Sequence, residues 1–247
     1  MENWQIDINC DVGEGIGNET SLFPLISSCN IACGGHAGDV NTMRDIAGLA
    51  MEHKLKIGAH PSYPDREHFG RVSMKIPPQD LQAVIHEQLT TLQNILRRQN
   101  ALLHHIKPHG ALYNDMMADL LLANTFLEAI SYFKSSCFLF VPYGSVIAEE
   151  ASKQGFKIQY EAFADRRYLG GYHLAPRKMA GAVIESPEAV LQQLLGMVKE
   201  KKLRTLDGRQ LPIEAQTFCI HGDTPSAFQI LMYLAKELPN QGIYLNK

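Results

Sequence analysis

Short apolar runs alternate along the chain with longer segments in which apolar residues recur every three or four positions. A short apolar run is typical of a buried strand, and the longer period is typical of a helix with one buried face. The strands predicted on this basis span residues 4–10, 30–33, 56–59, 102–106, 137–141, 157–161 and 216–220. Helical segments separate them, so the chain is built from repeated strand–helix units.

Capping residues mark several helix starts. Asp39 precedes a helical apolar pattern, and Pro77-Pro78 precedes another. Ser186-Pro187 and Thr224-Pro225 each fit an N-cap residue followed by proline at the first helical position, where no backbone N–H is needed. Residues 205–212, with Asp-Gly at their centre, predict a small hairpin before the last strand.

Repeated strand–helix units imply parallel strands joined by crossover helices. About seven units without a change in composition predict a single α/β domain over residues 1–247, closed into a variant (β/α) barrel. A doubly wound open sheet is the alternative. Residues 60–77 and 162–185 are rich in turn residues and charges, and we expect them to be loops over the functional site.

Composition and charge narrow the function classes. The net charge of −3 over 247 residues argues against a nucleic-acid surface, which needs a concentrated basic face. The sequence shows no signal peptide and no apolar run of membrane-spanning length, and its five scattered cysteines suit the reduced thiols of a cytoplasmic protein. Cys29, Cys33 and His36 are close enough to suggest a metal site. A second ligand pair at matching spacing is missing, so we expect buried free thiols.

Ionisable residues follow nearly every predicted strand. In chain order they are Asp11, His36, His60, Lys107, His109, Asp165, Arg166, His221 and Asp223. The carboxyl ends of parallel strands lie on one face of such a fold, where the following loops form the active site. We therefore expect these side chains to surround one cavity at the mouth of the barrel, where they could act as general acids and bases or bind a metal.

Several known motifs are absent. Asn18 takes the place of the last glycine that a dinucleotide fingerprint would need after Gly13, Gly15 and Gly17. The sequence contains no phosphate-binding P-loop, no nucleophile elbow and no His-Glu-x-x-His helix. The glycines in residues 34–39 precede a helix, where they could bind an anion or simply allow a tight turn.

Six segments together resemble the LamB/YcsF family. They are Asp-Ile-Asn-Cys-Asp-Val-Gly-Glu (7–14), Asn-Ile-Ala-Cys-Gly-Gly-His-Ala-Gly-Asp (30–39), Ile-Gly-Ala-His-Pro (57–61), Lys-Pro-His-Gly-Ala-Leu-Tyr (107–113), Phe-Ala-Asp-Arg (163–166) and His-Gly-Asp-Thr-Pro (221–225). The resemblance covers essentially the whole chain. Gly35 stands where the family pattern has an aromatic residue, and Ser62 stands where glycine is usual, which puts the shape of the pocket in question.

The resemblance implies a variant (β/α) barrel related to the polysaccharide deacetylases. It also implies the A subunit of an ATP-dependent 5-oxoprolinase, which acts with subunits B and C to open the lactam of 5-oxoproline to L-glutamate. We expect the partner subunits to handle ATP with this chain. The alternatives are a metal-dependent deacetylase or amidohydrolase, with Asp11, His60 and His109 as metal ligands, and a non-catalytic subunit that binds the substrate. A sugar-handling barrel is disfavoured because the predicted site offers few aromatic residues.

Within the 5-oxoprolinase hypothesis, the strand-end residues are assigned roles. Asp11 is the candidate base for the attacking water, and His109 and His221 are candidates for protonating the departing nitrogen. Lys107 and Arg166 are candidates for holding a carboxylate or phosphoryl group. The remaining candidates for substrate binding are His36, Asp165 and Asp223. We expect Lys107 and His109 to matter for turnover more than for folding; the alternative is that Lys107 pairs with Asp11 or Asp223 to hold the rim together.

Overall fold

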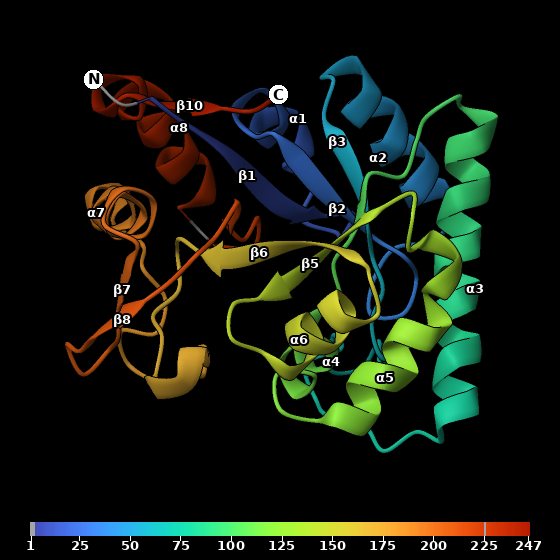
Figure 1. Cartoon of the computed structure of the whole chain (residues 1–247). Helices are drawn as coiled ribbons and strands as arrows, with labels where there is room; N and C mark the ends of the chain where they lie inside the picture. The colour runs from blue at the N-terminus through green and yellow to red at the C-terminus, as the bar shows by residue number, and fades with distance from the viewer. Residues whose placement is uncertain (1–2, 225) are drawn as a thin grey trace.

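The centre of the protein is a closed ring of seven parallel strands. The structure is a computed structural model, which describes residues 3–224 and 226–247 (Figure 1). The strands are β1 (Trp4–Val12), β2 (Ser28–Ala32), β3 (Lys56–His60), β4 (His105–Ile106), β5 (Phe138–Pro142), β6 (Lys157–Phe163) and β9 (Thr217–Cys219). Each pairs in parallel with the next, and β9 pairs with both β6 and β1. The predicted seven-stranded barrel is therefore confirmed, and the closed ring excludes a doubly wound open sheet.

A further strand, β10 (Ile243–Leu245), lies outside this ring and was not predicted. It pairs in parallel with residues 4–6 at the start of β1. Gly242, in the left-handed conformation at φ 71°, ends the preceding turn and directs the chain into this strand. β1 is consequently paired with three other strands, namely β2, β9 and β10.

Helices surround the barrel (Figure 1). The longer ones are α2 (Val40–Glu52), α3 (Pro78–Arg98), α5 (Leu120–Ala129), α6 (Val146–Lys153), α7 (Pro187–Lys199) and α8 (Ala227–Glu237). The shorter ones are α1 (Glu19–Leu22), α4 (Gly110–Asp115), η1 (Phe23–Leu25), η2 (Ser131–Phe133), η3 (Gly170–Tyr172) and η4 (Pro239–Gln241). In α3, Leu81, Ile85, Leu89 and Leu92 form one buried face. Each contributes about 1.5–3 kcal/mol by leaving water, so this face holds α3 against the barrel.

Two of the predicted helix caps are confirmed. The side chain of Asp39 accepts a hydrogen bond from the backbone N–H of Thr42 at 2.8 Å and starts α2. The Ser186 hydroxyl accepts one from the N–H of Ala189 at 3.3 Å and starts α7, with proline at the first helical position. These caps satisfy N–H groups that the helices leave without a backbone partner.

The predicted cap at Thr224 is wrong. α8 begins at Ala227 with Ser226 as its N-cap residue, and Pro225 lies outside the described residues. The hydroxyl of Thr224 instead donates a hydrogen bond to Asp165 at 3.1 Å. Thr224 therefore belongs to the contacts around the cavity rather than to the helix.

The strand boundaries differ from the predicted ones in two informative places. β1 extends two residues further and so includes Asp11, whereas β4 is only two residues long. Leu102, at the start of the predicted fourth strand, is 87% exposed and lies outside the barrel. The predicted hairpin is present but begins before residue 205: its strands are β7 (Lys202–Arg204) and β8 (Gln210–Pro212), which pair antiparallel.

The inside of the barrel is polar rather than apolar. Asn9 donates to Glu161 at 3.0 Å and to Thr217 at 2.7 Å, and it accepts from Asn30 at 2.7 Å. His105 donates to the other side of Asn30 at 2.6 Å. All five side chains are buried. A buried network of this kind is favourable only when its members find partners, so it fixes the register of the strands that carry it.

One glycine makes room for this network. A Cβ atom added to Gly58 in β3 would lie 2.0 Å from Nε2 of His105. The imidazole of His105 therefore occupies the space that a side chain at position 58 would need, and it stacks on Phe140 with ring centroids 4.0 Å apart.

All five cysteines are buried and free of disulfide bonds, as predicted for Cys29 and Cys33. None of the described helices combines the length and the hydrophobicity that crossing a membrane requires.

Candidate active site

A cavity of about 580 Å³ opens at the carboxyl ends of the barrel strands. Side chains from β1, β3, β6, the loops that follow the strands and the short helix α4 line it. Of the residues predicted for the site, the cavity is lined by Asp11, His60, Lys107, His109, Arg166 and His221. It is also lined by Glu14, Arg71, Tyr113, Phe163, His173, Arg177 and Lys178, which the sequence analysis did not assign.

Three predicted site residues lie behind this lining rather than in it. His36 contacts Glu14, and Asp165 contacts His221. Asp223 contacts Arg71 and Arg177. Each of the three thus touches a residue that faces the cavity.

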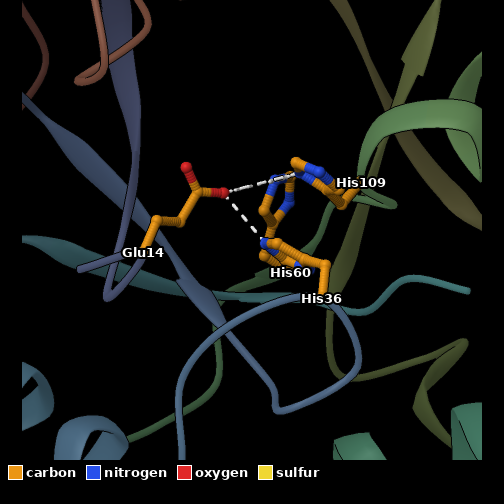
Figure 2. Close-up of side chains that lie close together, drawn as sticks. All are labelled: Glu14, His36, His60 and His109. Carbon is orange, nitrogen blue, oxygen red and sulfur yellow. Dashed lines mark hydrogen bonds and ion pairs between the residues drawn. The ribbon is translucent and has the colours of Figure 1, made fainter. Parts of the chain in front are cut away.

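Glu14, His36, His60 and His109 converge at one point beside the cavity. They come from four separate elements: the loops after β1 and β2, the end of β3, and the residue before α4. Figure 2 shows the carboxylate of Glu14 directed at the three imidazole rings. Its Oε1 lies 2.9 Å from Nε2 of His36, 3.5 Å from Nδ1 of His109 and 4.0 Å from Nε2 of His60.

Backbone carbonyls fix the protonation of two of these rings. Nδ1 of His60 lies 2.7 Å from the carbonyl oxygen of Lys107, and Nε2 of His109 lies 3.0 Å from that of Phe69. A carbonyl only accepts, so both nitrogens carry a proton. The remaining nitrogens, Nε2 of His60 and Nδ1 of His109, then face each other across 2.9 Å with their lone pairs. Two lone pairs at this distance repel each other unless a proton or a metal ion lies close to both nitrogens.

The donor set fits a divalent metal ion. One ligand atom from each of the four residues lies within 4.8 Å of all the others. Three imidazoles and one carboxylate are a set that zinc binds, and a carbonyl that accepts a hydrogen bond from the other ring nitrogen of a ligand histidine is a common feature of metal sites. Nδ1 of His36 is buried and has no hydrogen-bond partner in the described part of the chain. Glu14, His36, His60 and His109 could therefore hold the metal.

The metal set predicted from the sequence contains two of these four residues, His60 and His109. Its third member, Asp11, lies 3.4 Å from Nε2 of His60 through Oδ2. The other oxygen of Asp11 accepts from Lys107 at 2.9 Å and from Asn30 at 2.7 Å. Asp11 therefore lies next to the four-residue group rather than within it, and one of its two oxygens is already hydrogen-bonded to Lys107 and Asn30.

Asp11, Cys219 and His221 form a second group of possible ligands, and Lys107 contacts two of them, Asp11 and Cys219. Its ammonium is 2.9 Å from Asp11, 2.9 Å from Glu161 and 3.1 Å from the thiol of Cys219. The ammonium thus already supplies the positive charge that a metal ion would bring. These contacts match the alternative in which Lys107 pairs with an acidic neighbour.

The charges of this buried group support one another. Burial alone would lower the pKa of Lys107, but Asp11 and Glu161 outweigh it and hold that pKa well above its ordinary value. Burial would likewise raise the pKa of Asp11, but His60 and Lys107 hold it well below the usual range. Lys107 is therefore cationic and Asp11 anionic at neutral pH.

His221 is held from behind by Asp165. Nδ1 and the backbone N–H of His221 both lie 2.9 Å from the carboxylate of Asp165. Burial would raise the pKa of Asp165, but His221 and its backbone N–H hold it below its ordinary value. The ring of His221 stacks against Phe163 at 5.3 Å. A carboxylate behind an imidazole fixes its tautomer and orientation, which suits a general acid or base.

Sequence reasoning missed Glu14, Glu161, Arg71 and Arg177. Glu14 follows the first strand between two glycines, so the rule applied to the other strand ends would have found it. Glu161 lies at the end of the predicted strand 157–161. A charged residue in a strand that is otherwise expected to be buried was the signal that could have identified it. Arg71 and Arg177 lie within long loops, whose paths leave no periodic pattern in the sequence.

Comparison with known proteins identifies the family. Residues 6–247 match the LamB/YcsF family. The lactam utilization protein from Thermus thermophilus is 36% identical, with a TM-score of 0.91 over 98% of this chain and 99% of that one. A family 4 carbohydrate esterase from Streptomyces lividans shares the fold at 10% identity and a TM-score of 0.50, over 99% of this chain and 93% of that one. The chain belongs to the LamB/YcsF family, and its barrel is of the polysaccharide-deacetylase type, as expected.

Proposed function

We propose that this LamB/YcsF-family protein hydrolyses the lactam of 5-oxoproline to L-glutamate as the A subunit of an ATP-dependent 5-oxoprolinase, together with subunits B and C. The observation that carries the proposal is that three groups of residues adjoin one cavity. They are the Glu14–imidazole group, the Asp165–His221 pair and the arginines Arg71, Arg166 and Arg177. The similarity to a lactam utilization protein supports a cyclic amide as the substrate class.

Hydrolysis of a lactam needs a polarised carbonyl, a deprotonated water and a protonated leaving nitrogen. A divalent metal at Glu14, His36, His60 and His109 would supply Lewis acidity for a carbonyl or a bound water. Asp11 lines the cavity and its Oδ2 is free of Lys107, with Nε2 of His60 at 3.4 Å, so Asp11 can accept a proton from water. Its depressed pKa makes it ionised but weakly basic, which suits a water that is already activated.

His221 is the proposed acid. Asp165 binds its Nδ1, which leaves Nε2 to donate a proton to the departing nitrogen at the cavity wall. The sequence suggested that Asp165 binds the substrate. In this proposal Asp165 instead positions His221 and does not touch the substrate. When the ring opens, the nitrogen becomes an amine and the carbonyl carbon becomes the second carboxylate of glutamate.

The need for ATP points to the partner subunits. The chain has no P-loop, and an unstrained lactam is stable to water unless its carbonyl is activated. We therefore propose that subunits B and C contribute the ATP-dependent step, and that water attack and ring opening occur in this cavity.

Reconstitution tests the proposal. Purified chain should form glutamate from 5-oxoproline when ATP and both candidate partners are present, and little when any of them is omitted. The Asp11→Asn and His221→Gln variants should still assemble but lose about 100-fold or more in turnover, the range of general acid–base catalysis. Full turnover by complexes carrying these variants would instead make the chain a non-catalytic, substrate-binding subunit.

The Glu14–imidazole group favours a second candidate, a metal-dependent amidohydrolase that needs no ATP. The two differ in one measurement. The amidohydrolase should act alone on amides, lose activity with a chelator and regain it with zinc, whereas the 5-oxoprolinase subunit should remain inactive without ATP and partners.

A further inference from the structure

Arg166 is a buried cation without a carboxylate partner in the described part of the chain. It is only 6% exposed and lines the cavity. Its Nη2 donates to the carbonyl oxygen of Ala175 at 2.6 Å, while its Nε is buried without an acceptor among the residues that the structure describes. The adjacent carboxylate of Asp165 is engaged by His221 and Thr224. Burying an unpaired guanidinium is costly, so this position is suited to an anion that arrives from the cavity.

Two further arginines lie at the same cavity and share one carboxylate. Nη2 of Arg71 lies 2.7 Å from Asp223. Nη1 of Arg177 lies 3.2 and 3.3 Å from the two oxygens of Asp223, and Nη2 of Arg177 lies 3.3 Å from Oδ1. The three residues come from the loops after β3, β6 and β9, so the contact ties these loops together. The long bonds from Arg177 leave it able to turn toward another acceptor.

Positive charge is therefore in excess on this side of the cavity. Four cationic side chains line it, Arg71, Arg166, Arg177 and Lys178, and Asp223 is the carboxylate that contacts them in the described structure. Lys107 does not add to the excess, because Asp11 and Glu161 each lie 2.9 Å from its ammonium.

We propose that Arg166 and Arg177 form an anion subsite that binds the carboxylate of the substrate and selects cyclic amides that carry one. The guanidinium group offers paired N–H donors that match the two oxygens of a carboxylate. The identity of the ring rests on the function proposed above, whereas the binding of an anion at these arginines does not.

Calorimetric titration of the purified chain tests the subsite with two ligands that share a ring. 5-Oxoproline carries a carboxylate on the lactam, and 2-pyrrolidinone is the same lactam without it. Hydrogen bonds to charged groups contribute about 1.5–3 kcal/mol each, so 5-oxoproline should bind at least about tenfold more tightly. Arg166→Gln and Arg177→Gln should each remove about tenfold or more of its affinity.

Arg167→Gln is the matched control. Arg167 is the next residue in the chain, but it bonds to Gln193 at 3.0 Å and does not line the cavity, so its loss should leave affinity unchanged. If Arg166→Gln does not fold, Arg166→Lys replaces it, because lysine keeps a cation at this position. Arg166→Lys should lose less affinity for 5-oxoproline than Arg177→Gln does. Circular dichroism melting of every variant separates loss of binding from loss of folding.

The outcomes separate this subsite from the proposed function. Equal affinity for the two lactams, or unchanged 5-oxoproline binding in the folded arginine variants, would overturn the subsite. If 5-oxoproline does not bind but acetate does, and the two arginine variants lose acetate binding, the subsite stands and the proposed substrate fails. If neither 5-oxoproline nor acetate binds the wild-type chain, the subsite is rejected.

Discussion

Lys107→Met keeps most of the length of the side chain and removes the ammonium that several buried groups share. Nζ of Lys107 lies 2.9 Å from a carboxylate oxygen of Asp11 and 2.9 Å from one of Glu161. Lys107 itself is 2% exposed, and the side chain of Glu161 is fully buried. The variant therefore leaves the buried carboxylates of Asp11 and Glu161 without the cation that lies between them. Glu161 keeps the hydrogen bond that the side chain of Asn9 donates to it.

The expected loss of stability follows from this geometry. Removing one partner of a buried ion pair costs about 3–5 kcal/mol, because the other charge stays buried without compensation. Each kcal/mol lowers the melting temperature of a protein of this size by about 2–4 °C. We therefore expect Lys107→Met to melt about 6–20 °C below the wild type at pH 7 in a calorimetric scan.

The pH dependence of this loss has a defined sign. A buried carboxyl group that has lost its cation has a pKa above its unfolded value of about 4. Such a group favours the folded state when it is protonated, so the variant should approach the wild type as pH falls toward about 4. Lys107→Met/Glu161→Gln removes one of the two abandoned charges and should recover part of the loss at pH 7. A melting temperature of Lys107→Met within about 2 °C of the wild type, well below the shift calculated for a lost buried pair, would refute the structural role and return Lys107 to catalysis.

Four further measurements test other parts of the site. Purified protein should carry a divalent metal, and Glu14→Gln should retain at least about tenfold less after dialysis, as measured by elemental analysis; equal retention would exclude Glu14 as a ligand. Asp165→Asn should lower kcat in the reconstituted complex by about 100-fold or more with KM near the wild-type value, because it acts through His221 rather than on the substrate. The depressed pKa of Asp165 gives stability that is present above the unfolded pKa of about 4 and is lost as pH falls further, so the difference in melting temperature between wild type and Asp165→Asn should shrink below about pH 4. The isolated chain should show little or no ATPase activity, and robust turnover would reveal a nucleotide site outside the known motifs.

The positions of the strands could be predicted because apolar runs and caps are local signals. The strand-end rule brought Asp11, His60, Lys107, His109 and His221 to one cavity, since parallel strands must end on the same face. Closure of the ring was predicted from the number of strand–helix units, but the pairing that closes it could not be derived from local signals, because β1 and β9 lie far apart in the sequence.

The partners of each side chain depend on register across the barrel, which the sequence does not display. The sequence places Lys107 at the mouth of the barrel. It does not show that the charge of Lys107 is compensated by Glu161, which contacts it from β6. The same limit explains why Asp165 was assigned to the substrate. Its distance along the chain from His221 hides the hydrogen bonds that occupy its carboxylate.

The loop residues were the hardest to predict. Arg71 and Arg177 meet at Asp223 through loops without regular hydrogen bonding, so no period in the sequence relates their positions. The short strand β10 escaped for a different reason. Three residues are too few to show an alternation, and their extended conformation is imposed by pairing with β1.

The pairing of β1 with β2, β9 and β10 also sets the order in which the chain can fold. During synthesis β1 emerges from the ribosome before the other strands, yet its partners β9 and β10 emerge after the rest of the barrel. Until then one edge of β1 has unsatisfied backbone groups and is open to pairing with other chains. Contacts between such distant segments also form slowly, because a long loop must close before they are gained. Nascent chains of this protein should therefore depend on holding chaperones until residues 217–245 are available, and C-terminal truncation should cause aggregation rather than a smaller folded barrel.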